Sequence, residues 1–276
     1  MKLSIITINY NNCAGLKKTI DSVVAQTYRD FEWIVIDGGS TDGSRALIEQ
    51  NASHLSYWVS EPDHGVYHAM NKGLDAAQGE YLLFLNSGDW LVAADTLEKC
   101  RLDSTSADVL YGDSLFVFQD HIEEIRYPDP LMFNDLYKGF LGHASSFIKS
   151  GLLRKERYTE QYKIVSDWEF WIKMALKDAS FVHLPLFVSY FDTTGISSTN
   201  ERLRTAERNQ VISEFVPRMV AEDCKYIKRL ETQLGDDQVK SVLHYGHKKK
   251  LYHKLITASL LVIKFLDRFC GHSRQP

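Results

Sequence analysis

Short apolar runs alternate with helix-patterned stretches over the first 113 residues of the chain. The runs are rich in β-branched and aromatic residues and are bounded by turn residues, which is typical of strands. They occupy Leu3 to Asn9, Phe31 to Asp37, Tyr57 to Ser60, Tyr81 to Leu85 and Val109 to Tyr111. Between the first two, residues 16–24 carry apolar side chains at helical spacing. This alternation predicts an α/β fold with a Rossmann-like, mostly parallel central sheet flanked by helices.

The section from residue 114 to about 200 is expected to complete this sheet. Strand patterns at Leu115 to Gln119 and Phe187 to Phe191 accompany a helical pattern at Asp167 to Leu176. From residue 201 onward the pattern is helical. We therefore expect one main domain over residues 1–200 and a helical C-terminal extension over residues 201–276.

Composition narrows the classes of function. With 36 acidic and 32 basic residues, the net charge is -4, so the chain has no general attraction for nucleic-acid phosphates. The four cysteines are scattered without a Cys-x-x-Cys spacing, which favours neither a zinc site nor a disulfide framework. The N-terminus enters a strand pattern directly, without the features of a signal peptide. A cytoplasmic protein is expected.

Polar residues follow two of the predicted strands. Asp37 is followed by a glycine-rich turn that opens a helix, and glycine lets a backbone approach a ligand closely. The carboxylate of Asp37 can accept hydrogen bonds from a nucleobase. The alternative is an ordinary strand-to-helix turn with Asp42 as the helix N-cap. The glycine spacing does not match the dinucleotide-binding motif, which disfavours a dehydrogenase.

The second polar segment, Asn86-Ser87-Gly88-Asp89, follows the strand at residues 81–85. Strands of a parallel sheet bring their carboxyl ends to one edge, so this segment should lie near Asp37. Hard cations such as Mg²⁺ and Mn²⁺ prefer oxygen ligands, which makes Asp89 the candidate metal ligand. The alternative is a turn aspartate that caps the next segment.

These motifs, in this order, resemble the family 2 glycosyltransferases of the GT-A fold, of the inverting type that acts in bacterial surface-polysaccharide synthesis. The resemblance covers about 200 residues. It rests on the opening strand Ile5 to Asn11, on Asp37 with Ser40 to Gly43, on Met70 to Gly73, on Gly79 to Tyr81 and on the aspartate segment.

The resemblance implies that residues 1–113 bind a nucleotide-diphospho-sugar donor and that residues 114–200 bind the acceptor. The expected donor contacts are Thr7, Asn9, Asp37, Gly38, Ser40, Asp42, Asp63, Gly65, Asn71, Lys72, Asn86, Ser87 and Gly88. For Asp63 to Lys72, the alternative is a turn with solvated side chains, although a helix N-terminus also suits a diphosphate.

The metal site departs from the family pattern. The usual Asp-x-Asp is Asn86-Ser87-Gly88 here, which leaves Asp89 as the carboxylate of this segment. Either Asp89 binds Mn²⁺ or Mg²⁺ with Asn86 as a neutral helper, or metal dependence is weaker than is usual for the family.

Inverting transfer needs a carboxylate that removes the proton of the acceptor hydroxyl. The resemblance assigns this role to Asp167, which opens a helix. It assigns His143 to contact with the acceptor or the diphosphate. Trp168, beside Asp167, offers an aromatic face that could stack on an acceptor sugar. The alternatives are a carboxylate that only complements the helix dipole, a structural histidine and a core tryptophan.

The expected function is sugar transfer to an acceptor hydroxyl, with inversion, in the synthesis of a capsule, exopolysaccharide or lipopolysaccharide. Two alternatives stay open. One is a weak or inactive nucleotide-sugar-binding protein, since the Asp-x-Asp carboxylates are missing. The other is a nucleotidyltransferase, although residues 9–12 do not form the basic, glycine-rich loop expected there.

The last part of the chain, residues 244–274, is basic. Lys248, Lys249, Lys250 and Lys254 precede the apolar run Leu255 to Ile263, which is shorter than the roughly 20 residues that cross a bilayer. Arranged as a helix, this segment would place apolar side chains on one face, as in helices that lie on anionic membranes. The alternative is a helix packed on the catalytic domain. We expect an enzyme peripheral to the inner face of the cell membrane, with a glycan or lipid-linked acceptor.

Truncation after Gly246 tests the membrane hypothesis. Each Lys or Arg near an anionic surface contributes about 1 kcal/mol of attraction, so the full-length protein should sediment with anionic liposomes at low salt and the truncated protein should not. Transfer to a water-soluble acceptor should be largely retained. Failure of the full-length protein to sediment would favour the packed helix.

Overall fold

The computed structural model describes residues 1–139, 141–195 and 200–234 of the 276-residue chain. The chain divides into two compact units, residues 1–217 and 218–276. The first unit includes helix α9 (Glu201–Phe215), and the described part of the second is helix α10 (Arg218–Leu234). The division expected near residue 200 stays a prediction, and the basic segment 244–274 lies outside the described residues.

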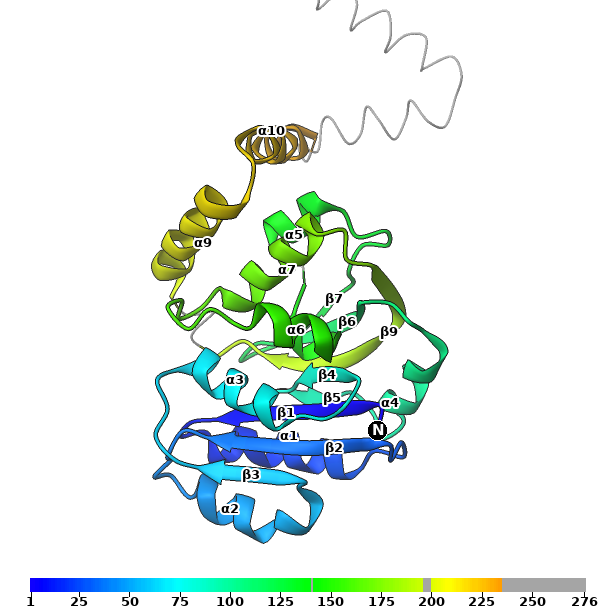
Figure 1. The fold of residues 1–276 in the computed structure, drawn as a ribbon, viewed down its shortest axis with the longest axis vertical. Coiled ribbons are helices and arrows are strands. Elements are labelled where there is room, and N and C mark those ends of the chain that lie inside the picture. Colours follow the sequence, from blue (N-terminus) through cyan, green and yellow to red (C-terminus); the bar gives the residue numbers. More distant parts are fainter. Residues whose placement is uncertain (140, 196–199, 235–276) are drawn as a thin grey trace, which may run out of the picture. The chain divides into compact units, whose positions relative to one another are not determined.

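A single mixed sheet of nine strands forms the centre of the first unit in the part of the chain that the structure describes (Figure 1). Its order is β3-β2-β1-β4-β8-β6-β9-β5, and β7 pairs with β6. The strands are β1 (Leu3–Asn9), β2 (Phe31–Asp37), β3 (Tyr57–Ser60), β4 (Tyr81–Phe84), β5 (Trp90–Leu91), β6 (Val109–Val117), β7 (Ile122–Ile125), β8 (Ser146–Lys149) and β9 (Phe181–Asp192).

The parallel part consists of β1 to β4 and is covered on both faces. Every residue of β1 is buried. Leu3 and Ile5 pack in one core cluster with Leu16 and Ile20 of α1 (Cys13–Val24). On the other face, Ile6 lies directly against Gly73 of α3 (Val66–Ala76). Figure 1 shows α3 in front of these strands and α1 behind them, as the hydrophobic pattern predicted.

The second part joins the same sheet, which confirms that residues 114–195 complete it. β8 is antiparallel to β4 and β6, while β6 and β9 are parallel. The predicted strands 109–111 and 115–119 are one strand, β6, which pairs with β9 along its whole length despite an irregularity in the register around Asp113. β9 is longer than the predicted 187–191, because it pairs with β6 from Phe181 to Asp192.

Shorter helices complete the unit. The remaining ones are α2 (Ser44–Gln50), α4 (Thr96–Lys99), α5 (Phe133–Lys138), α6 (Ser150–Glu156), α7 (Ser166–Leu176) and the 3₁₀ turns η1 (Ala52–His54), η2 (Leu102–Ser104) and η3 (His143–Ser145). α7 agrees with the predicted helix at residues 167–176. Asp167 lies in the first turn of α7, and the hydrophobic pattern of the helix does not explain an aspartate at this position.

The register of the parallel strands aligns polar residues at one edge. Asn9 pairs with Asp37 between β1 and β2, and Asp37 pairs with Ser60 between β2 and β3. These are the last residues of their strands. In α/β sheets, ligands bind beyond the carboxyl ends of the strands, so this edge is where a site is expected.

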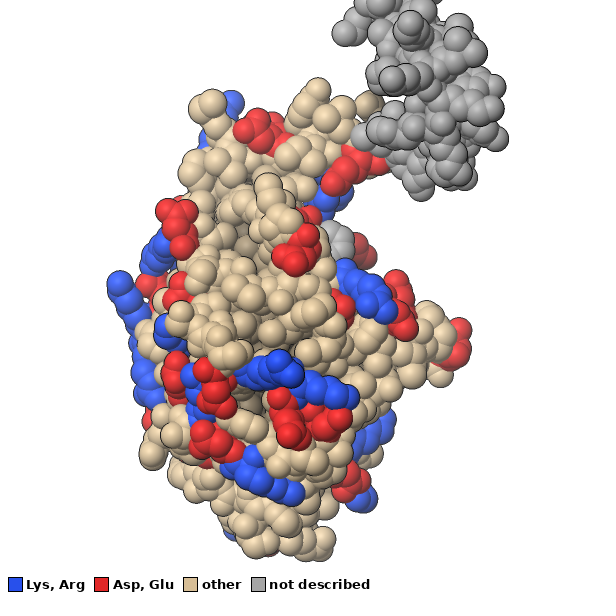
Figure 2. Space-filling model, turned by 90° about the vertical axis from the view of Figure 1, so that its right-hand side faces the viewer, with Lys and Arg blue, Asp and Glu red and all other residues tan. Residues whose placement is uncertain are grey.

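The distribution of charge on the surface agrees with the near balance of 32 basic and 36 acidic residues. On the face that Figure 2 presents, basic and acidic side chains are interspersed. Within the described ranges, no helix combines the length and the apolar character needed to cross a membrane.

Replacement of Gly79 by alanine should destabilise the sheet. An added Cβ would lie 2.5 Å from the backbone nitrogen of Ser4 and 2.6 Å from the carbonyl carbon of Leu3, so β1 would have to move. We expect Gly79→Ala to lower the free energy of unfolding by about 1–3 kcal/mol, measured by urea denaturation.

Gly151→Ala is the matched control. Gly151 lies in α6, and an added Cβ there would meet nothing within 4 Å. Alanine is the better helix former by about 1 kcal/mol, so this variant should be neutral or more stable. Equal destabilisation of both variants would contradict the packing assigned to Gly79.

Candidate active site

Asp37 joins the carboxyl ends of three strands. Its Oδ1 accepts hydrogen bonds from Asn9 Nδ2 at 2.7 Å and Ser40 Oγ at 2.6 Å. Its Oδ2 accepts from the Ser40 backbone nitrogen at 2.9 Å and Ser60 Oγ at 2.6 Å. Burial alone would raise the pKa of Asp37, but these hydrogen bonds lower it below its ordinary value. The carboxylate is therefore ionised and fixed before any donor binds.

The glycine-rich turn after Asp37 lies against the start of α3. A Cβ on Gly38 would come within 2.6 Å of Asp63 Oδ2, and Asp63 Oδ1 accepts from the Gly65 backbone nitrogen at 2.8 Å. Tyr10, which follows β1, lies beside Gly38 and is 67% exposed. The structure thus brings together three predicted donor residues and an aromatic ring that is free to stack on a base.

Asp42 connects the first two helices. Its Oδ2 accepts from the backbone nitrogen of Cys13 at 2.7 Å, where α1 begins. Its Oδ1 accepts from the backbone nitrogen and the hydroxyl of Ser44, where α2 begins. Both contacts satisfy backbone donors at helix N-termini. In this structure, the contacts of Asp42 support the turn.

Three other predicted donor residues make their contacts within the fold. Thr7 is fully buried, and its hydroxyl accepts from the Trp33 ring nitrogen at 3.0 Å. Asn71 is buried and exchanges hydrogen bonds with the backbone of Tyr158. Lys72 forms an ion pair with Glu61. These three residues hold the surrounding elements in place.

Asp167 is held by two side chains from distant parts of the sequence. Tyr67 Oη, in α3, lies 2.8 Å from Asp167 Oδ1 and 2.6 Å from the carbonyl oxygen of Ile164. His143 Nδ1 lies 3.0 Å from Asp167 Oδ2. The side chain of Asp167 keeps 20% of its surface exposed, so a substrate hydroxyl can reach it.

His143 connects Asp167 with the segment after β4. Its Nε2 lies 3.0 Å from Asn86 Nδ2 and 3.9 Å from Asp89 Oδ2. The histidine stands in η3, directly before β8, which pairs with β4. The predicted base, the predicted acceptor-side histidine and the predicted metal ligand therefore form one cluster.

The ionisation of this cluster follows from burial and charge. Burial raises the pKa of Asp89 to about 7, although His143 opposes the rise. Burial also tends to raise the pKa of Asp167, but the hydrogen bond and the charge of His143 lower it below its ordinary value. Burial tends to lower the pKa of His143, yet Asp167 and Asp89 raise it. Asp167 is thus the ionised carboxylate at neutral pH.

Asp89 also contacts the end of β9. The backbone nitrogen of Asp192 donates to Asp89 Oδ1 at 2.9 Å. Ser87 is held by its backbone, because its nitrogen donates to the carbonyl of Ile8 and its carbonyl accepts from Asn12 Nδ2. Gly88 has a φ of +105°, which favours glycine. The segment after β4 is therefore fixed by its neighbours.

The residues around Asp89 fit a divalent cation that the donor itself helps to bind. Asn86 Oδ1 is buried and has no hydrogen-bond partner among the described residues, and Asp89 Oδ2 lies 3.9 Å from His143 Nε2. Oxygens of this kind suit Mg²⁺ or Mn²⁺. Over the ranges 1–139, 141–195 and 200–234, no three His, Cys, Asp or Glu side chains form a complete metal cage. Phosphate oxygens would have to complete the coordination.

Trp168 lies between α5 and α9. Its ring nitrogen donates to the carbonyl of Leu136 at 2.6 Å, and the guanidinium of Arg208 lies 4.3 Å from the centre of its ring. The tryptophan is buried. Its contacts fix α7 against neighbouring helices, so they do not present an aromatic face to an acceptor.

Sequence reasoning missed three residues that shape the site. Tyr67 and Asp192 contact Asp167 and Asp89 across the fold, and buried Glu207 of α9 accepts from the backbone nitrogens of Lys163 and Ile164 ahead of α7. Tyr67 stands in the segment 61–73 that was already singled out. No pattern in the sequence marks Asp192 or Glu207.

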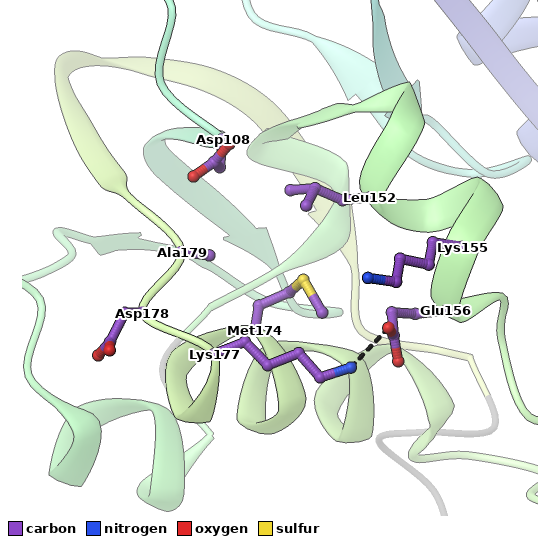
Figure 3. Close-up of a pocket in the computed structure, with 8 residues that line it drawn as sticks. All are labelled: Asp108, Leu152, Lys155, Glu156, Met174, Lys177, Asp178 and Ala179. Carbon is purple, nitrogen blue, oxygen red and sulfur yellow. Dashed lines mark ion pairs between the residues drawn. The ribbon is translucent and has the colours of Figure 1, made fainter.

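A cavity of about 230 Å³ lies away from this cluster (Figure 3). It opens between the C-terminal ends of α6 and α7, where Lys177 forms an ion pair with Glu156. None of the predicted site residues lines it. The chemistry is therefore assigned to the strand edge.

Comparison with known proteins agrees with this geometry. The model of the family "Glycosyl transferase family 2" matches residues 4–150 of this chain. An uncharacterized glycosyltransferase of Mycobacterium tuberculosis (strain H37Rv) is 34% identical over 206 residues, which cover 72% of this chain and 78% of that protein. A PGL/p-HBAD biosynthesis glycosyltransferase of Mycobacterium bovis BCG is 32% identical, covering 71% and 79%. The chain belongs to glycosyl transferase family 2 and is a glycosyltransferase.

Solved structures support the GT-A fold. Residues 1–349 of S. aureus TarS, in complex with UDP-GlcNAc, match with a TM-score of 0.63 at 20% identity, covering 78% of this chain and 72% of that one. The match covers 43% of the longer TarS structure. The mannosyltransferase PcManGT from Pyrobaculum calidifontis, in complex with GDP-Man and Mn²⁺, matches with a TM-score of 0.58 at 15% identity, covering 99% and 88%.

Replacement of Tyr67 by phenylalanine should loosen Asp167. It removes the hydroxyl that contacts Asp167 Oδ1 and leaves the Ile164 carbonyl without that donor. We expect the free energy of unfolding to fall by about 1–3 kcal/mol in denaturant titrations. The transfer rate should fall as well, because Asp167 loses one of its two side-chain supports.

Tyr158→Phe is the matched control for stability. Tyr158 is a buried neighbour of Tyr67, and its hydroxyl has no hydrogen-bond partner among the described residues. Removal of this hydroxyl should not lower stability. If the two variants lost the same stability, the hydrogen bonds assigned to Tyr67 would not be the cause.

Proposed function

We propose that this glycosyltransferase transfers a sugar from a nucleotide-diphospho-sugar to an acceptor hydroxyl, with inversion, by a single displacement in which Asp167 is the general base. The observation that carries the proposal is the state of Asp167. It is ionised, partly exposed and oriented by His143 and Tyr67 beside the strand edge where the donor is expected. A general base must be positioned before it is useful, and these contacts supply the position.

The displacement balances without a further reactant. The acceptor oxygen forms a bond to the anomeric carbon, and its proton passes to Asp167. The bond from the anomeric carbon to the phosphate oxygen breaks, and the nucleoside diphosphate leaves with the electron pair. Attack from the side opposite the leaving group inverts the anomeric configuration. Proton removal by a positioned group contributes about 10²–10⁴-fold to such a step.

The donor is expected to lie along the carboxyl ends of β1 to β4. Buried Asp37 and Asn9 form, with partly exposed Ser40, the hydrogen-bonded group beside which a base would bind, and Tyr10 offers an exposed ring. Gly38 and Gly65 leave the backbone accessible near Asp63. A divalent cation bound by Asp89 with Asn86 would neutralise charge on the leaving diphosphate.

The acceptor is proposed to be a glycan or lipid-linked molecule of the cell surface. A relative of this chain is named as a PGL/p-HBAD biosynthesis glycosyltransferase, and this supports a biosynthetic role for the transfer. The basic segment 244–274, which lies outside the described residues, supports a peripheral position on the inner face of the cell membrane. Family membership favours sugar transfer over the nucleotidyltransferase alternative.

Asp167→Asn tests the base. A screen of nucleotide-sugars by thermal shift, with and without Mn²⁺, identifies the donor, because a ligand that binds the folded state raises the melting temperature. With that donor, the variant should retain the thermal shift while kcat falls by about 10²–10⁴-fold. NMR of the product of the wild-type enzyme should show an inverted anomeric configuration.

Asp178→Asn is the control, because it makes the same chemical change beyond the opposite end of α7. Asparagine also tolerates the positive φ of +56° at that position. Its kcat should equal that of the wild type. An unchanged kcat in Asp167→Asn, or a product with retained configuration, would refute the assigned mechanism.

A further inference from the structure

Position 88 of the metal motif is a glycine and has no side chain, but the side chain of Asp192 lies next to it in the fold. Gly88 stands at the last position of the segment that replaces the family's Asp-x-Asp. A Cβ added to Gly88 would lie 2.9 Å from Asp192 Oδ2 and 3.3 Å from Asp192 Cβ. The carboxylate of Asp192, at the end of β9, therefore occupies the space into which a side chain at position 88 would extend.

The backbone of Asp192 also orients Asp89. Its nitrogen donates to Asp89 Oδ1 at 2.9 Å, which leaves Oδ2 of Asp89 directed elsewhere. Asp192 Oδ1 accepts from the backbone nitrogen of Thr194 at 2.9 Å. In the described part of the chain, no hydrogen bond or ion pair involves Oδ2 of Asp192. One oxygen of each carboxylate thus accepts a hydrogen bond from the backbone of the segment that follows β8 and includes the end of β9.

A third oxygen belongs to the same group. Asn86 Oδ1 is buried and has no partner among the described residues, although buried polar atoms are usually hydrogen-bonded. The backbone of the segment links Asn86 to Asp89, since the nitrogen of Asp89 donates to the carbonyl of Asn86 at 2.9 Å. The segment after β4 and the end of β9 therefore bring the side chains of Asn86, Asp89 and Asp192 to one part of the site.

We propose that Asp192 supplies the second carboxylate of the divalent-cation site, so that Asp89 and Asp192 together replace the family's Asp-x-Asp pair. Asn86 adds a neutral oxygen, and the diphosphate of the donor completes the coordination. The proposal rests on the proposed function, because the donor supplies those phosphate oxygens. It assigns a metal-binding role to a residue outside the motif.

Physical chemistry favours this arrangement over a site with Asp89 alone. Mg²⁺ and Mn²⁺ are commonly bound by one or two carboxylates together with substrate phosphates. Two neighbouring carboxylates repel each other, and a cation between them removes that repulsion. Without the cation, the same charges would repel a diphosphate. The pair therefore makes donor binding depend on the metal.

Asp192→Asn separates this role from a structural one. Asparagine keeps the backbone nitrogen that contacts Asp89 and an oxygen that can accept from Thr194, so the turn after β9 is retained. Only the negative charge is lost. Asp192→Glu keeps the charge on a longer side chain, and Asp178→Asn makes the Asp-to-Asn change at a remote position.

The experiment measures Mn²⁺ and nucleotide binding by the full-length proteins. Free Mn²⁺ is followed by electron paramagnetic resonance in the presence of UDP or GDP, whichever gives the larger thermal shift. Nucleotide affinity is then measured by calorimetry, once with Mn²⁺ and once with EDTA. Neither readout requires turnover or knowledge of the acceptor.

We expect Asp192→Asn to weaken Mn²⁺ binding by at least about tenfold, the loss that metal sites typically suffer when a supporting group is removed. Asp192→Glu should retain more affinity than Asp192→Asn, and Asp178→Asn should match the wild type. In EDTA, Asp192→Asn should bind the nucleotide as well as the wild type or more tightly. A purely structural role would instead weaken nucleotide binding under both conditions.

Two results would overturn the inference. Mn²⁺ affinity in Asp192→Asn equal to that of the wild type, together with a loss in Asp89→Asn, would leave Asp89 as the carboxylate ligand without Asp192. Absence of Mn²⁺ and Mg²⁺ binding to the wild-type complex would remove the site altogether. In either case, sugar transfer with inversion, measured separately, would still stand or fall on Asp167.

Discussion

The contact of His143 with the partly exposed carboxylate of Asp167 and the buried carboxylate of Asp89 is the constraint on which the catalytic cluster depends. Asp167 lies 3.0 Å from one ring nitrogen, and Asp89 lies 3.9 Å from the other. Neighbouring carboxylates repel each other, and the imidazole of His143 stands between these two and hydrogen-bonds Asp167, which keeps them apart. Because η3 carries His143 beside β4 and β8, the pairing of these strands sets the distance between base and metal side.

The donor edge is organised by a different principle. Asp37 is saturated by hydrogen bonds from the ends of β1 and β3 and from its own turn, so it is already ionised and immobile. Such preorganisation means that donor binding does not have to order these groups. The two halves of the site thus differ, with a fully bonded carboxylate at one end and unpartnered oxygens at the other.

Polar residues in a motif do not all face a ligand. The sequence alone could not distinguish those that line the site from those whose contacts lie within the fold. Asp37, Asp63, His143, Asp89 and Asp167 were predicted from strand ends, helix starts and family resemblance, and the structure places them at the strand edge or in the cluster beside it. Thr7 and Asn71 come from the same motifs, yet both are buried and bonded to Trp33 and Tyr158. Trp168 packs on Arg208 in the same way. Side-chain direction depends on packing partners that local patterns do not specify.

The sequence by itself determined strands β1 to β4, helix α1, the edge of the sheet where the candidate site lies and the family, because hydrophobic periodicity and strand-end motifs are local properties. It did not predict the short β5 and α4. Tertiary structure alone decided that Tyr67 supports Asp167 and that Asp192 stands beside Gly88. Tyr67 and Asp167 are 100 positions apart in the sequence, and Asp89 and Asp192, which the same tertiary structure brings into contact, are 103 positions apart. Contacts over such distances arise only when β9 and α3 are placed by the whole sheet, so no short stretch of sequence encodes them.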